Sequence, residues 1–128
     1  MLENFMQQLA KEFEISGDFA TGVPGMYAIN LDGNVLIEIA QIPQGFTLNC
    51  KVCNCPKSKE EAFYTQAMLA NLFGQGTRGA VLGINEEGTL VTLAKLVDYT
   101  IDYKEFRDII EDFINCVDYW KEEAIVYQ

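Results

Sequence analysis

The sequence predicts an α+β fold in one domain spanning residues 1–128, with the element order α-β-β-β-α-β-β-α and a mainly antiparallel sheet packed against helices. Three observations support this fold class. Apolar residues recur at helical spacing near both ends of the chain, over residues 2–15 and 102–120. Asp32-Gly33-Asn34 separates two apolar runs, as in a β-hairpin. The length of 128 residues is sufficient for one hydrophobic core.

The first half of the chain predicts one helix and three strands. The apolar positions of the helix over residues 2–15 are Leu2, Phe5, Met6, Leu9 and Phe13. Glycines and Pro24 then interrupt the pattern and predict a loop. The hairpin strands are expected at 26–31 and 35–40, because Asp-Gly tolerates the positive φ of a type I′ turn. A third strand follows Gly45, with apolar residues alternating from Phe46 to Val52.

The second half predicts two helices and a second hairpin. Ser58 and Glu61 fit a capping box for a helix that runs to about Phe73 and ends at Gly74. Strands at about 80–84 and 89–97 flank a polar turn. Asp102 and Glu105 fit another capping box, and the helix after them carries an apolar stripe from Phe106 to Trp120.

Composition excludes several classes of function. Nine Lys+Arg against nineteen Asp+Glu leave a net charge of −10, so nucleic acid would be repelled and is not expected as a partner. The chain has no histidine, which excludes Ser-His-Asp and Cys-His catalysis, and we predict no enzyme activity, cofactor or metal site. It shows no secretory signal and no bilayer-spanning apolar run. We therefore expect a cytoplasmic protein with reduced thiols and no membrane insertion.

Two motifs could indicate a nucleotide site or a metal or thiol site. Residues from Gly74 to Gly79 match G-x-G-x-x-G, but they follow a helix and precede a strand, whereas a dinucleotide site requires the reverse order. Cys50, Cys53 and Cys55 leave open a small zinc or thiol-redox protein, although a structural zinc site usually takes four ligands. Cys50 is most simply a core residue. The carboxylates of the last helix are expected to form a solvated face.

The second helix carries more apolar surface than one sheet can cover. Phe63, Ala67 and Ala70 form one stripe. The opposite side is also apolar, with Ala62, Met68, Leu69, Leu72 and Phe73. Because each large apolar side chain contributes about 1.5–3 kcal/mol when it leaves water, we expect a partner chain on whichever stripe the sheet leaves uncovered. The simplest partner is a second copy across a two-fold axis, and the alternative is a second layer of the same chain. Strand 89–97 is likewise apolar on both faces.

The layout resembles the class I chaperones of bacterial type III secretion, a family similar to the Tir chaperone. The resemblance covers nearly the whole chain. Its main segments are Met68-Leu69-Ala70-Asn71-Leu72-Phe73, Leu93-Ala94-Lys95-Leu96 and the helix from Phe106 to Trp120. It implies an acidic α+β dimer without ATPase activity, which binds an N-proximal, largely extended segment of a secreted effector in the bacterial cytoplasm and keeps it export-competent.

The resemblance also implies two contact sites. Family dimers associate through the second helix and a late strand, in a homodimer or a heterodimer with a related chaperone. This predicts a dimer interface of Phe63, Ala67, Met68, Ala70, Leu72 and Leu93. Effector grooves use the first helix and the early strands, which predicts contacts from Leu2, Phe5, Met6, Leu9, Val35, Ile37 and Ile39. A dimeric regulatory adaptor without a secretion role is a further alternative.

Overall fold

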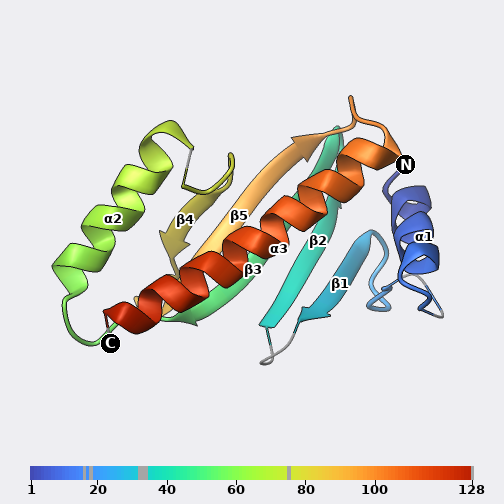
Figure 1. The fold of residues 1–128 in the computed structure, drawn as a ribbon. Helices are drawn as coiled ribbons and strands as arrows, with labels where there is room; N and C mark the ends of the chain where they lie inside the picture. Colours follow the sequence, from blue (N-terminus) through green and yellow to red (C-terminus); the bar gives the residue numbers. More distant parts are fainter. Residues whose placement is uncertain (16, 18, 32–34, 75, 128) are drawn as a thin grey trace.

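The computed structural model describes residues 1–15, 17, 19–31, 35–74 and 76–127. Within these residues the chain forms three helices and five strands, in the predicted order (Figure 1). The helices are α1 (Leu2–Glu12), α2 (Glu60–Phe73) and α3 (Tyr103–Val126). The strands are β1 (Met26–Leu31), β2 (Val35–Ile42), β3 (Gly45–Asn54), β4 (Val81–Ile84) and β5 (Leu90–Asp98). The predicted α+β fold class is confirmed.

The five strands form one antiparallel sheet in the order β1-β2-β3-β5-β4. The chain leaves β3 through α2, returns at the far edge as β4 and turns back as β5 between β3 and β4. The edge strands are therefore β1 and β4. The predicted turn at Asp32-Gly33-Asn34 lies outside the described residues, but Leu31 pairs with Val35 as a hairpin requires.

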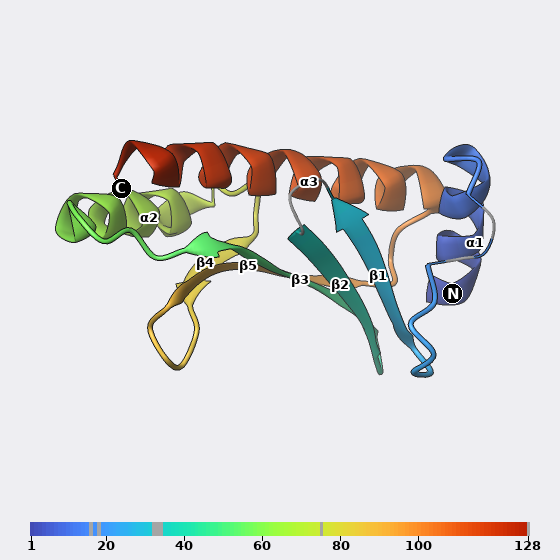
Figure 2. The same cartoon turned by 90° about the horizontal axis from the view of Figure 1, so that it is seen from below.

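The helices occupy different parts of the sheet. The long helix α3 runs across one face, while α1 lies at the β1 side and α2 lies beside the β4 edge (Figures 1 and 2). None of these three helices covers the opposite face of the sheet (Figure 2). None of the described helices is long and apolar enough to cross a membrane.

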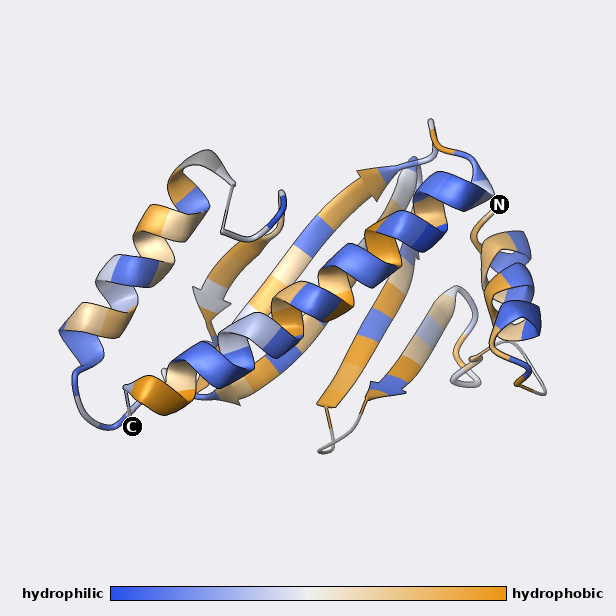
Figure 3. Ribbon diagram, viewed as in Figure 1, coloured by the Kyte–Doolittle hydropathy of each residue, from blue (hydrophilic) through white to orange (hydrophobic). Residues whose placement is uncertain are grey.

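The core lies between α3 and the sheet. On β3, Phe46, Leu48 and Cys50 are buried and alternate with more exposed polar residues, as the sequence predicted. The apolar stripe of α3 faces these residues, and hydrophilic residues alternate with it along the helix (Figure 3). Ring contacts join the layers, with the Phe46 and Phe106 centroids 5.4 Å apart.

The helix ends test the predicted caps. Asp102 and Glu105 form the predicted capping box, and Gly74 ends α2 with a left-handed φ of 68°. The predicted box at Ser58 and Glu61 is wrong. The N-cap of α2 is Lys59, with no side-chain cap, and the Ser58 hydroxyl instead donates to the Tyr127 carbonyl oxygen at 3.1 Å. A tertiary contact with the end of α3 therefore replaces the local cap.

Candidate polypeptide-binding surfaces

The residues predicted to contact an effector are buried within the single chain. All seven have at most 6% of their surface exposed: Leu2, Phe5, Met6, Leu9, Val35, Ile37 and Ile39. Phe5 stacks on Phe106 of α3, with ring centroids 4.9 Å apart. The apolar face of α1 is thus covered by the chain's own α3, and a partner cannot reach it in this conformation. Amphipathic spacing indicates that one face of a helix is buried, but it does not show whether the same chain or a partner chain packs against that face.

Exposed apolar side chains lie where α1 ends. The helix was predicted to reach residue 15 but stops at Glu12, because Glu14 takes a left-handed φ of 54°. Phe13 and Ile15 are consequently 49% and 44% exposed. Phe13 borders a cavity of about 310 Å³ whose apolar wall includes Ile110 and Ile114 of α3. Ile15 borders a second cavity of about 490 Å³, which also reaches Phe19.

The second cavity opens beside the edge of β1, at Ala28 and Asn30. The Ala28 N–H donates to the Phe19 carbonyl at 3.0 Å, and the Thr21 N–H donates to the Met26 carbonyl at 3.4 Å. These bonds cover the start of the edge, whereas Asn30 lies nearer its end. We call Phe13, Ile15, Phe19, Ala28 and Asn30 the α1–β1 surface. It combines apolar side chains with strand-edge backbone.

At the other end of the sheet, the predicted dimer residues divide into two groups. Phe63 and Leu93 are buried in the core of the single chain, so they are not available to a partner. Ala67 and Ala70 are half-buried. Met68 and Leu72 are 72% and 65% exposed. Met68 and Leu72 therefore face outward, whereas Phe63 on the other stripe packs against Trp120 and Tyr127 of α3.

An apolar groove of about 450 Å³ runs between α2 and β4. Its walls include Ala67 and Met68 of α2 and Ile84 of β4. The Asn71 side chain holds the two elements together, since its amide donates to the Leu82 carbonyl and accepts from the Leu82 N–H, both at 2.9 Å. The Asn71 side chain thereby provides hydrogen-bond partners for the backbone of Leu82 at the edge of β4, as a neighbouring strand would.

Six exposed apolar side chains lie on α2, β4 and β5, and two of them, Met68 and Ile84, line the groove: Met68, Leu69, Leu72, Val81, Ile84 and Leu96. We call this set the α2–β5 surface. The sequence prediction missed Val81, Ile84 and Leu96 as interface residues. The sequence feature that could have predicted Leu96 is the run of apolar residues on both faces of β5. Leu93 points inward, and Leu96 is 70% exposed.

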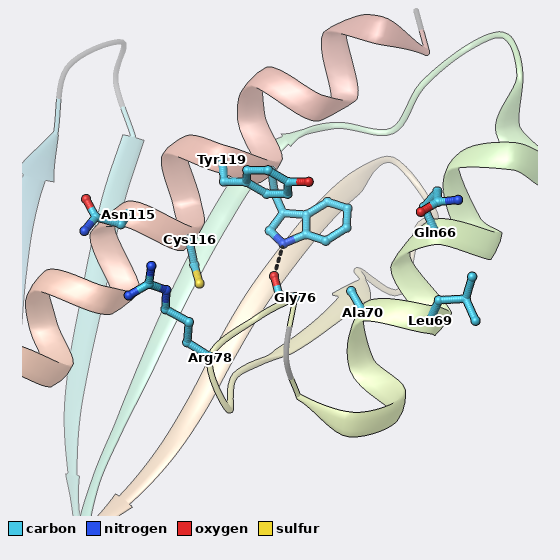
Figure 4. A pocket seen from close by; sticks show the side chains of 9 residues that line it. Gln66, Leu69, Ala70, Gly76, Arg78, Asn115, Cys116 and Tyr119 are labelled. Atoms are coloured by element: carbon cyan, nitrogen blue, oxygen red, sulfur yellow. Dashed lines mark hydrogen bonds between the residues drawn. The ribbon is translucent and has the colours of Figure 1, made fainter.

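A third cavity, of about 510 Å³, lies between α2 and α3 (Figure 4). The G-x-G-x-x-G loop forms part of its wall. Gly76 is required there because an added Cβ would lie 2.6 Å from the Ala70 Cβ. The Trp120 indole N–H donates to the Gly76 carbonyl at 2.9 Å. Gly74 ends α2, so both glycines have steric roles in a helix-to-strand loop.

Cys50 and Cys53 of β3, and Cys55 directly after it, are free thiols. Cys50 is buried, and Cys53 and Cys55 are half-buried. Burial raises the pKa of Cys50 to about 11, and burial followed by the nearby Cys55 raises the pKa of Cys53. Among the described residues, no three His, Cys, Asp or Glu side chains are grouped as metal ligands. The raised thiol pKa values of Cys50 and Cys53 do not favour the thiol-redox alternative.

This leads to a prediction for thiol reactivity. At neutral pH, Cys50 in the folded protein should react with iodoacetamide about a hundredfold more slowly than in urea, because the thiolate is the nucleophile and a pKa near 11 depletes it. Mass spectrometry of alkylated peptides over time measures the rate, with the unfolded chain as control. Fast alkylation of Cys50 in the folded state would contradict the prediction and favour a reactive thiol.

Residues 4–121 of the chain match the Tir chaperone protein (CesT) family. A Chlamydia pneumoniae protein, CPj0713/CpB0740, is 28% identical over 122 residues, which cover 94% of this chain and 93% of that protein. The match includes every helix and strand except the first residues of α1 and the last turn of α3.

Solved structures show the same fold at low sequence identity. The ExsC–ExsE complex contains a chain with a TM-score of 0.77 and 13% identity, covering 94% of this chain and 91% of that one. The Yersinia pestis type III secretion chaperone SycH, in complex with a stable fragment of YscM2, gives a TM-score of 0.69 at 10% identity over 100% of both chains. The heterodimeric ExoU–SpcU complex of the type III secretion system of Pseudomonas aeruginosa gives 0.68 at 9% identity, covering 98% and 95%. Because the family match spans nearly all the described elements, this chain belongs to the Tir chaperone protein (CesT) family.

Proposed function

We propose that this protein is a type III secretion chaperone that binds an N-proximal, largely extended segment of a secreted effector in the bacterial cytoplasm and keeps it export-competent. Membership of a chaperone family supports binding rather than catalysis. The structural observation that carries the proposal is the α1–β1 surface, where exposed apolar side chains adjoin a strand edge. ExsC, SycH and SpcU, in structures that this chain resembles, each occur in a complex with another polypeptide.

The α1–β1 surface fits an extended segment better than a folded domain. A strand added to a sheet edge gains main-chain hydrogen bonds, and its alternate side chains can enter pockets. The two cavities beside Phe13 and Ile15, of about 310 and 490 Å³, provide such pockets. The excess of carboxylates, with a net charge of −10, favours a segment with basic residues and keeps the loaded complex soluble.

We further propose that two copies associate through the α2–β5 surface. The apolar groove between α2 and β4, with the exposed Met68 and Ile84 in its walls, supports this proposal, and a two-fold interface would cover the same side chains on both copies. The groove between α2 and β4 can receive apolar side chains from the second copy. A heterodimer with a related chaperone would use the same surface.

A binding experiment tests the effector site. The tagged protein is expressed in its own bacterium, the bound polypeptide is identified, and its N-proximal fragment is titrated calorimetrically. Phe13→Ala is expected to weaken binding about tenfold. It removes an exposed side chain from the pocket wall, and the burial of that side chain against the segment would contribute roughly 1–2 kcal/mol to binding. Its unfolding free energy should change little.

The matched variant Phe5→Ala tests the assignment of the surface. Phe5 is a core residue, so this change should lower the unfolding free energy by roughly 3–5 kcal/mol. The proposed function fails if the bound polypeptide is not exported by type III secretion, or if only a folded domain of it binds. The assignment of the surface fails if Phe13→Ala binds the fragment as tightly as the original chain.

A further inference from the structure

A short segment of the loop before β1 already pairs with the free edge of that strand. Within it, Ala20 forms an isolated antiparallel bridge with Tyr27 of β1. We call residues 19–21 the strap. The strap also lines the cavity of about 490 Å³ beside the β1 edge. It therefore lies where the exported polypeptide is proposed to bind.

The strap uses the hydrogen-bonding groups that an added strand would need. The Ala28 N–H donates to the Phe19 carbonyl at 3.0 Å, and the Met26 carbonyl accepts from the Thr21 N–H at 3.4 Å. Because main-chain groups alternate in direction along a strand, the groups of Met26, Ala28 and Asn30 face this edge. One N–H has a single proton to donate. While the strap is in place, an added strand could therefore pair only at Asn30.

The strap is held weakly enough to be displaced. Phe19 takes a left-handed φ of 65°, which is unfavourable for a bulky side chain. The bond from the Thr21 N–H to the Met26 carbonyl is long, and both Ala20 and Thr21 are exposed. Gly22 follows with a φ of 89°, and no described atom lies within 4 Å of the position of an added Cβ there. The backbone can therefore turn at Gly22 without a clash.

Two side chains nevertheless keep the strap on the edge. Phe19 is half-buried and packs against the core. The Thr21 hydroxyl donates to the Met26 carbonyl at 3.0 Å and accepts from the Val23 N–H at 3.3 Å. Proteins often cover a sheet edge in this way, because a bare edge pairs non-specifically with other chains. The strap thus gives β1 a protected edge.

We propose that the strap is an autoinhibitory contact, which a bound polypeptide segment must displace from β1. The segment takes over the hydrogen bonds to Met26 and Ala28, and its side chains enter the cavity that the strap lines. Opening the strap reduces the apparent affinity for every segment, so a segment that fits the cavities poorly does not bind. The inference rests on the proposed function, because it concerns the edge at which the exported polypeptide is proposed to pair.

Nuclear magnetic resonance of the free and the loaded protein tests the proposal. The probe is the N-proximal fragment of the polypeptide that co-purifies with the tagged chain. In the free protein, nuclear Overhauser effects are expected between Ala20 and Tyr27 across the bridge. On saturation with the fragment these should disappear, and new ones should join Ala28 to the fragment.

The outcomes separate the strap from the proposed function. Ala20–Tyr27 signals that persist in the loaded protein, or a bound fragment without contacts to Ala28, overturn the strap and leave the proposed function intact. Absence of the Ala20–Tyr27 signals from the free protein also overturns the strap. If no exported polypeptide binds the chain, both proposals fail.

A variant with a weakened strap provides the second readout. Thr21→Val removes both hydroxyl hydrogen bonds and keeps the branched shape, so the strap should open more readily and the fragment should bind about fivefold more tightly. Thr65→Val is the matched control, since it removes an exposed hydroxyl that donates to the Glu61 carbonyl within α2 at 2.8 Å. It should leave the affinity unchanged. Calorimetric titration measures both, and an unchanged or weaker affinity of Thr21→Val would contradict an autoinhibitory role.

Discussion

Replacing Met68 and Leu72 together by aspartate is expected to convert the proposed dimer into a monomer. Both side chains lie on the exposed stripe of α2, at 72% and 65% exposure. A large apolar side chain contributes about 1.5–3 kcal/mol on full burial, and a two-fold interface counts each one twice. Because only about two-thirds of each side chain is exposed and can still be buried, the lost burial is about 4–8 kcal/mol, which should weaken self-association by at least roughly a thousandfold.

Size-exclusion chromatography with light scattering measures this change directly. The control is Ile125→Asp, which places one aspartate at an apolar position that is 67% exposed near the end of α3. It should leave the oligomeric state unchanged. Far-UV circular dichroism should match the original chain for both variants, because the substituted side chains lie outside the core. A monomeric original chain, or a double variant that stays dimeric, would remove the α2–β5 surface as the interface.

Gly45→Ala is expected to prevent stable folding. Gly45 is buried at the start of β3 and pairs with Ile42 of β2 and Asp98 of β5. A Cβ there would lie 2.0 Å from the Val97 carbonyl oxygen and 2.8 Å from the Asp98 Cα. Both are backbone atoms of the central β5, so the clash can be relieved only by separating β3 from β5. The expected loss exceeds about 4 kcal/mol, a large part of the stability of a domain this size.

Urea unfolding followed by circular dichroism tests the effect of Gly45→Ala. Gly83→Ala is the matched control, because it adds the same methyl group to a strand of the same sheet. The nearest atom to its Cβ would be the Thr92 hydroxyl oxygen at 3.2 Å, which belongs to a side chain that can move. This control should fold and unfold cooperatively. A Gly45→Ala protein with the original urea midpoint would show that β3 and β5 tolerate separation at this point.

The candidate site illustrates how far apolar spacing can be interpreted. The stripe of α1 correctly indicated an amphipathic helix, and the region around α1 and the early strands remains the proposed effector surface. Burial separates the residues of this region, because Phe5 and Ile37 face the core of the single chain whereas Phe13 and Ile15 are exposed. Nothing in the spacing distinguishes them, since the exposure of Phe13 depends on the left-handed turn at Glu14.

Local periodicity, turn residues and short-range pairing were sufficient to predict the fold class, the order of the elements and the cap at Asp102, whereas the family was indicated by the resemblance of several segments. Tertiary structure alone decided which apolar face is covered. The inner stripe of α2 packs on Trp120, the outer stripe faces solvent, and Ser58 bonds to Tyr127 instead of capping its own helix. These outcomes depend on how distant segments meet in space. Whether a residue is buried depends on the segments that pack against it in the fold. The apolar spacing of a helix or strand indicates only that one face packs against something.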